Sequence, residues 1–165
     1  MPTNNRWWQG SSISGWTLVP MRLVIGVGFL QHGLAKWNRG PEAFSRLLAY
    51  LGVPLPLATA WMVTSLEIVG GLLLIMGVLV TIISIPLAVS MLVAMFSIHV
   101  HFGFSAINTV GLTANGPVFG PPGYEINLLY LAALWALAVS APTPWSLDRW
   151  RSGAKGSTTQ PTSPT

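Results

Sequence analysis

The chain has 165 residues, of which 52% are hydrophobic and only 7% are charged. Soluble domains average roughly 25% charged residues, so this composition excludes an ordinary soluble protein and predicts an integral membrane protein of one domain. Cysteine is absent, which excludes a disulfide framework, a thiolate nucleophile and cysteine-held iron–sulfur clusters. The net charge of +4 includes no run of Lys or Arg, so we expect basic residues at membrane ends and no nucleic-acid partner.

Four apolar runs follow a polar N-terminal segment, residues 1–15, which carries a Trp pair and lacks the pattern of a cleaved signal peptide. Each run approaches the roughly 20 residues that a membrane helix needs. The second and third runs are nearly continuous, and one helix of that length would be far longer than a bilayer is thick, so we predict a tight hairpin there. The four runs cover residues 16–36, 57–80, 81–102 and 124–141.

The fold class that follows is an all-α integral membrane four-helix bundle over residues 16–150. Residues 38–56 contain a short amphipathic stretch that predicts an interfacial helix. Residues 103–123 are rich in Gly and Pro without a helical period, and we expect an irregular loop. The polar, low-complexity composition of residues 151–165 predicts a disordered tail. Four spans put both ends on one side, and the balance of Lys and Arg favours the cytoplasm.

The first span carries most of its polar groups on one helical face. Arg22, Ile25, Phe29, His32 and Lys36 follow one another at steps of three or four residues, which is the spacing of a single face. Charged groups are costly in hydrocarbon. We therefore expect this face to point into the bundle and away from lipid.

Glu67 is the acidic residue that lies well inside a span, the second one. An isolated carboxylate there would protonate or find a partner, and Arg22 is the candidate partner. Three interpretations stay open at this stage. The two residues form a structural contact between helices, they belong to a proton relay or ligand site, or they make no contact.

Histidines gather near the end of the third span, where His99 and His101 lie two residues apart. Spans one and three run in the same direction, so His99 and His101 lie on the same membrane side as His32 and Lys36. Glu125 begins the fourth span on that side. The alternatives are interfacial histidines bonded to backbone or water, a polar cavity for a small ligand, or a haem or metal centre. The ligand spacing is poor for a metal, and we predict no metal site.

The order and spacing of five short motifs resemble the DoxX family of small four-helix membrane proteins. That family's pattern runs from an Arg through His-Gly-x-x-Lys, a Glu before a Gly-rich run, a His near Gly-Phe-Phe, and Gly-Gly-Tyr-Glu, to Ser-Leu-Asp. The matching residues are Arg22, Gly26, Phe29, His32, Gly33 and Lys36; Glu67, Gly70 and Gly71; Phe102, Gly103 and Phe104; Gly123, Tyr124 and Glu125; and Ser146, Leu147 and Asp148. Two departures, a Pro-rich loop at 105–122 and Ala-Pro-Thr-Pro-Trp before Ser-Leu-Asp, leave the substrate open.

The resemblance implies a subunit of a quinone-linked oxidoreductase system in the bacterial cytoplasmic membrane. Whether the chain is catalytic on its own stays open, and so does its cofactor, for which a quinone is the candidate. The expected partners are the lipid bilayer, other membrane or soluble redox subunits, and further copies of the chain. A non-enzymatic scaffold for redox enzymes is the alternative, followed by a small-solute carrier. The expected catalytic residues are Glu67, His32 and Arg22, and the expected cofactor-binding residues are His32, Lys36, His99, His101 and Glu125.

Overall fold

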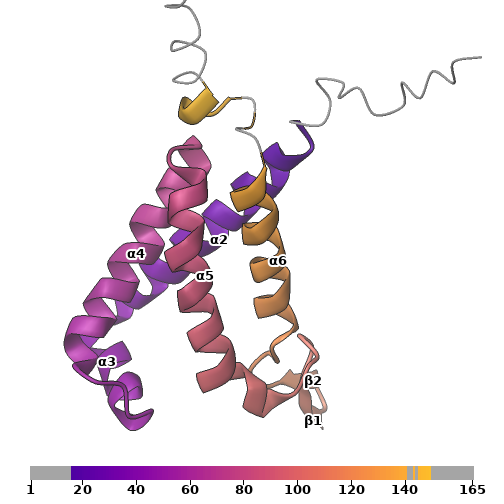
Figure 1. Cartoon of the computed structure of the whole chain (residues 1–165). Helices are drawn as coiled ribbons and strands as arrows, with labels where there is room; N and C mark the ends of the chain where they lie inside the picture. The colour runs from indigo at the N-terminus through magenta and orange to yellow at the C-terminus, as the bar shows by residue number, and fades with distance from the viewer. Residues whose placement is uncertain (1–15, 141–142, 144, 150–165) are drawn as a thin grey trace, which may run out of the picture.

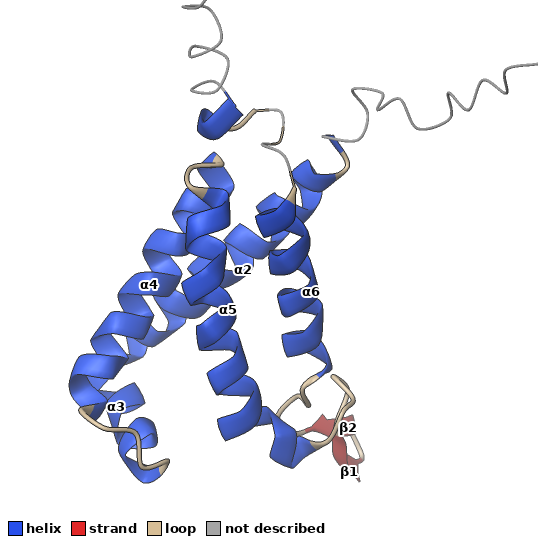
Figure 2. Cartoon of the chain, in the orientation of Figure 1, coloured by secondary structure: helices blue, strands red, loops and turns tan. Residues whose placement is uncertain are grey.

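The structure, a computed structural model, describes residues 16–140, 143 and 145–149. The predictions for residues 1–15 and 151–165 lie outside the described residues. Within them the chain forms a helical bundle with a small β-hairpin at one end (Figures 1 and 2). The elements are α2 (Leu18–Arg39), α3 (Pro41–Tyr50), α4 (Pro56–Met76), α5 (Val80–Ser97), the 3₁₀ helix η2 (His99–Phe102), β1 (Thr109–Thr113), β2 (Gly116–Phe119) and α6 (Glu125–Val139).

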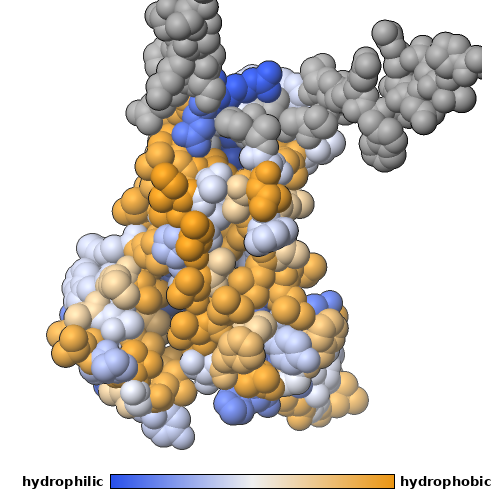
Figure 3. Space-filling view, in the orientation of Figure 1, coloured by the Kyte–Doolittle hydropathy of each residue, from blue (hydrophilic) through white to orange (hydrophobic). Residues whose placement is uncertain are grey.

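The predicted class of membrane helical bundle is confirmed. Helices α2, α4 and α5 are long and apolar enough to cross a membrane, and α6 is an apolar helix of 15 residues. The face of the molecule in Figure 3 is largely hydrophobic over these helices, and hydrophilic residues gather toward its two ends. A side-chain core joins the helices at Ile25, Phe29, Leu74, Leu87, Ala133 and Leu134.

Helices α2 and α4 approach so closely that glycine backbones form the contact. A Cβ atom on Gly71 would lie 2.6 Å from the backbone nitrogen of Leu30 and 2.7 Å from the carbonyl oxygen of Gly26. Small residues at such crossings let two membrane helices pack backbone against backbone. This crossing sets the register between α2 and α4, and therefore which of their polar residues can meet.

The predicted tight hairpin between the second and third spans is present. Helix α4 ends at Gly77, which adopts a left-handed conformation with φ 68°, as does Leu79 with φ 52°. The amide of Gly77 donates to Leu74 and the amide of Val78 donates to Leu73, which is the Schellman arrangement that ends many helices. Helix α5 begins at Val80, so the reversal takes three residues.

The loops agree with the prediction in one place and differ in another. The amphipathic stretch after the first span forms helix α3, and its position at a membrane interface stays a prediction. The prediction of an irregular loop at 103–123 was wrong in part, because β1 and β2 pair there as an antiparallel hairpin. Val110, Leu112, Val118 and Phe119 are strand formers on either side of a two-residue turn, and the surrounding Gly and Pro residues concealed them.

Candidate functional site

A cavity of about 1060 Å³ lies between α2, α3, α4 and α5. Most of its wall consists of apolar side chains from all four helices. Helices α4 and α5 meet at their connecting turn and diverge toward α3, which leaves this space between them (Figure 1). Among the polar and charged residues that line it are His32, Lys36, Arg39, Thr59, Glu67, Ser90, Ser97 and His99.

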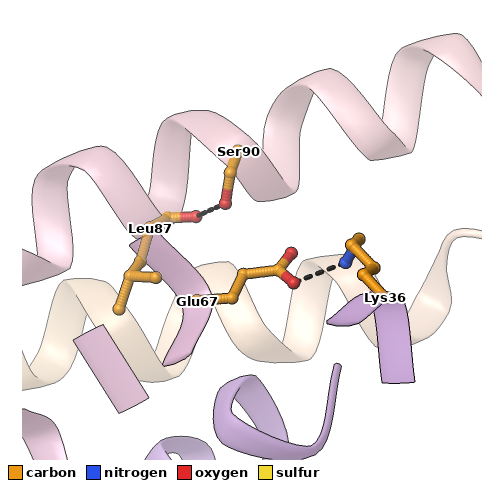
Figure 4. A network of polar contacts seen from close by, with 4 residues as sticks. All are labelled: Lys36, Glu67, Leu87 and Ser90. Atoms are coloured by element: carbon orange, nitrogen blue, oxygen red, sulfur yellow. Dashed lines mark hydrogen bonds and ion pairs between the residues drawn. The ribbon is translucent and has the colours of Figure 1, made fainter. Parts of the chain in front are cut away.

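An ion pair between Lys36 and Glu67 joins α2 to α4 at the cavity. Figure 4 shows the Lys36 ammonium directed at the Glu67 carboxylate, whose Oε2 accepts its hydrogen bond. The two side chains are 23% and 9% exposed, so the pair is largely shielded. The Lys36 ammonium also lies 5.4 Å from the ring centre of Phe44, a cation–π contact that attaches α3 to this end.

The predicted pairing of Arg22 with Glu67 was wrong, because the two residues lie at different depths in the bundle. The Arg22 guanidinium packs against Gly77, at the far end of α4 from the cavity. Gly77 follows Glu67 by ten residues, which corresponds to about 15 Å along a helix. The close crossing of α2 and α4 instead brings Glu67 level with Gly33, where a Cβ atom would lie 3.1 Å from that of Glu67.

Arg22 instead belongs to a polar cluster at the other end of the bundle. Its side chain is 2% exposed; Nη1 donates to Thr143 Oγ1 at 2.6 Å and Nη2 donates to the Trp145 carbonyl at 3.0 Å. Asp148 accepts from the amides of Leu79 and Val80 at 3.0 and 3.1 Å and so caps the start of α5. We call Arg22, Thr143, Trp145 and Asp148 the clasp, because they hold the end of the chain against the α4–α5 turn.

His99 reaches the cavity with its tautomer set by the backbone. Its Nδ1 lies 3.0 Å from the Pro122 carbonyl, which can only accept, so Nδ1 carries the proton. In the neutral ring Nε2 is then left with its lone pair. His32 is exposed and lines the cavity, and its ring lies 6.2 Å from that of Tyr130 on α6.

Two further predicted residues do not line the cavity. His101 is exposed in η2. Glu125 orders the loop before α6, because its Oε2 accepts from the Ala106 amide at 2.8 Å and its own amide donates to Phe104. The chain therefore uses Glu125 to fix the 103–123 segment. Among the described residues, no group of three His, Cys, Asp or Glu residues could hold a metal ion.

Sequence reasoning did not assign Phe44 or Ser90 to the site, although both line the cavity. Phe44 lies in the amphipathic stretch within residues 38–56, and its contact with Lys36 was not predicted. Ser90 lies in the middle of the apolar helix α5, opposite Glu67 in Figure 4, where its hydroxyl donates to the Leu87 carbonyl at 2.8 Å. A hydroxyl in the middle of such an apolar helix was the available signal, although Thr81, Ser84 and Ser97 of the same helix share it.

The model of the DoxX family matches residues 17–100, which is half of the chain. The chain belongs to the DoxX family. It is 29% identical over 139 residues to an uncharacterized protein of Haemophilus influenzae, covering 82% of this chain and 83% of that one. It is 27% identical over 144 residues to the uncharacterized membrane protein Rv3486 of Mycobacterium tuberculosis, covering 81% and 80%. No solved structure matches significantly.

The DoxX match contains the four helices that line the cavity. The motif residues separate in space: His32, Lys36 and Glu67 line the cavity, whereas Arg22 and Asp148 form the clasp. Within the cavity, an apolar wall carries two cationic side chains, an acid and two imidazoles. Such a wall with a few polar groups is typical of a site for an amphipathic small molecule whose polar end can exchange hydrogen bonds or protons.

Proposed function

We propose that this DoxX protein binds a quinone in the cavity and acts as a membrane subunit of an oxidoreductase system. The observation that carries the proposal is that Lys36, Glu67 and His99 line one largely apolar cavity. A quinone is a flat apolar ring with two carbonyl oxygens that accept hydrogen bonds. Lys36 supplies donors for such oxygens.

The fit is supported by hydrogen-bonding capacity that the described side chains do not use. Lys36 has three N–H groups and gives one to Glu67 Oε2. Glu67 accepts that bond through one oxygen, which leaves Oε1 able to accept a bond or hold a proton. His99 donates through Nδ1 to Pro122 and keeps Nε2 for a second partner.

When bound, a quinone accepts two electrons and two protons and becomes the hydroquinone. The electrons would come from a partner redox subunit, because lysine, glutamate and histidine do not carry them. Lys36 would orient a carbonyl oxygen by donating to it, while Glu67 Oε1 and His99 Nε2 would hold or pass the protons. The apolar wall would exclude water from the ring.

Equilibrium binding to the purified chain tests the proposal. Lys36→Met removes a charged donor, and such hydrogen bonds contribute about 1.5–3 kcal/mol, so quinone affinity should fall about 10- to 100-fold. Arg46→Met is the matched control: Arg46 is exposed and does not line the cavity. Equal quinone affinity of Lys36→Met and the control would rule out a headgroup site at Lys36. The absence of quinone binding by the unchanged chain would rule out the proposed function.

A second candidate function, a scaffold for redox enzymes, is favoured by the β-hairpin. Leu112, Phe119 and Val110 are 82%, 63% and 61% exposed, and the segment 103–123 has no charged residue. Exposed apolar groups of this kind often mark an interaction surface. A scaffold should lose its co-purifying partners on Leu112→Lys with Phe119→Lys while Lys36→Met keeps them, and the reverse result would exclude it.

Both described ends of the chain lie at the clasp end of the bundle, and we propose that this end faces the bacterial cytoplasm. The bacterial relatives and the four-helix arrangement support the location. Since the chain has no cysteine, single cysteines in place of Asn5 and Thr158 can be labelled from either side of the membrane. Labelling of both from the outside would reverse the orientation.

A further inference from the structure

The side of the cavity between α4 and α5 is formed by residues that are also exposed on the outer surface. Met62, Ile85, Val89 and Val93 are 64%, 61%, 54% and 51% exposed, and all four line the cavity. On α5, steps of four residues place 85, 89 and 93 in one stripe. Because α4 and α5 are long and apolar enough to span a membrane, this opening would face hydrocarbon.

The opening has a defined boundary at each end. Toward the clasp, Leu87 packs on Gly70, where a Cβ atom would lie 3.1 Å from the leucine side chain. This contact brings α4 and α5 together and ends the space between them. At the opposite end, α3 lies across the cavity and contributes Phe44, Leu47 and Leu48 to its wall. The apolar face of α3 therefore forms part of the cavity wall at the end away from the clasp.

Polarity changes in one direction across the cavity. Met62, Val89 and Val93 at the lipid-facing opening carry no polar side-chain group other than the thioether, whereas Lys36 and Glu67 lie at the α2–α4 contact on the inner side. A ligand that entered from the end at α3 would meet Arg39 and His99 as well as the apolar face of that helix. A membrane amphiphile could instead place its head at the ion pair and leave its tail in lipid.

We propose that the quinone enters sideways from the bilayer between α4 and α5, and that its isoprenoid tail lies along the stripe of Ile85, Val89 and Val93. This inference rests on the proposed quinone function and adds the class of ligand, a long-tailed membrane quinone, and its route. The tail would bury apolar surface on the stripe while the headgroup contacts Lys36.

Substitution by a bulky side chain at the opening between α4 and α5 tests the route by which the quinone enters. Val93→Trp fills the opening, and Val69→Trp is a matched control because Val69 is 52% exposed on α4 and does not line the cavity. The probes are a naphthoquinone with an isoprenoid tail and menadione, the same headgroup without a tail. We expect Val93→Trp to weaken binding of the tailed quinone about tenfold or more through lost apolar burial, and to leave menadione within about twofold.

A second measurement uses the unchanged chain, so the result does not depend on how a variant folds. A quinone with a photoreactive group at the end of its tail should label peptides of α4 and α5 that carry the opening. Labelling elsewhere, equal effects of Val93→Trp and Val69→Trp, or equal loss of menadione in Val93→Trp would overturn the route and leave the headgroup site standing. Failure of both quinones to bind the unchanged chain would instead overturn the proposed function.

Discussion

The two ends of the bundle bury polar groups in different ways. At the clasp end, the Arg22 guanidinium and the Asp148 carboxylate bond to the terminal segment and to the start of α5. At the cavity end, Lys36 and Glu67 bond to one another and keep further donors and acceptors facing a hollow. The comparison divides the motif residues of a DoxX chain into a group that holds the fold and a group that is available to a ligand.

The largest expected effect concerns the clasp. Arg22→Ala removes two hydrogen bonds from a charged, buried donor and leaves Thr143 and the Trp145 carbonyl without it. Each such bond contributes about 1.5–3 kcal/mol, so we expect a loss of about 3–5 kcal/mol in the free energy of unfolding. Unfolding in detergent measures it, with the exposed Arg46→Ala as control within about 0.5 kcal/mol. Similar values for the two variants would mean that the clasp does not hold the fold.

The next effect separates the two ends by their response to a ligand. A quinone at about 100 times its dissociation constant should stabilise the unchanged chain by about 2.7 kcal/mol. Asp148→Ala should keep this increment, because the clasp does not touch the cavity. Lys36→Met at the same quinone concentration should lose about 1.3–2.3 kcal/mol of it, given the expected fall in affinity. Thermal unfolding with and without quinone measures both. If Asp148→Ala also lost the stabilisation by quinone, the two ends of the bundle would act as one functional unit.

A double-mutant cycle tests the ion pair itself. Removing one partner of a buried pair typically costs about 3–5 kcal/mol, and the 23% exposure of Lys36 lowers our expectation for the coupling energy to about 2 kcal/mol. Lys36→Ala with Glu67→Ala should therefore lose less stability than the sum of the single changes. Arg22→Ala with Glu67→Ala should be additive within about 0.5 kcal/mol, and coupling there would restore the pairing that the structure contradicts.

The smallest effect is the helix cap. Asp148→Ala leaves the amides of Leu79 and Val80 without their carboxylate acceptor, and loss of such a cap costs about 0.5–2 kcal/mol. Asp148→Asn should recover part of the loss, since an amide oxygen also accepts. Hydrogen exchange at the start of α5 should rise in the alanine variant. Unchanged exchange there would show that the turn at Gly77 holds this helix end without Asp148.

Periodicity predicted the helices and part of the inward face of the first span. The structure buries Arg22, Ile25 and Phe29 there, whereas His32 on the same face is exposed and Lys36 is half-buried. It could not predict the partner of Glu67. Which residues of two antiparallel helices meet depends on their register, and that register follows from the backbone contact of Gly26 with Gly71. A hydrophobic pattern reports which face is buried and gives no depth relative to another helix.

The candidate site was predictable in its composition and less so in its extent. His32, Lys36 and His99 were expected on one membrane side, and they do line one cavity. His101 and Glu125 were placed with them by sequence position. The 3₁₀ turn of η2 leaves His101 exposed and outside the cavity lining, and the hydrogen bond from the Ala106 amide gives Glu125 a structural role in the loop. Local backbone geometry of this kind is not visible in spacing.

The glycine crossing of α2 and α4 also bears on how the protein can move. Where the Gly71 backbone meets the backbones of Gly26 and Leu30, no side chain lies between the helices that could change rotamer and let them slide. Helices α5 and α6 are joined by bonds of their own, such as Thr81 Oγ1 to the Ala138 carbonyl at 3.0 Å. Any widening of the cavity is therefore expected as a shear of the α5–α6 pair against a fixed α2–α4 pair, with the ion pair carried unchanged on the stationary half.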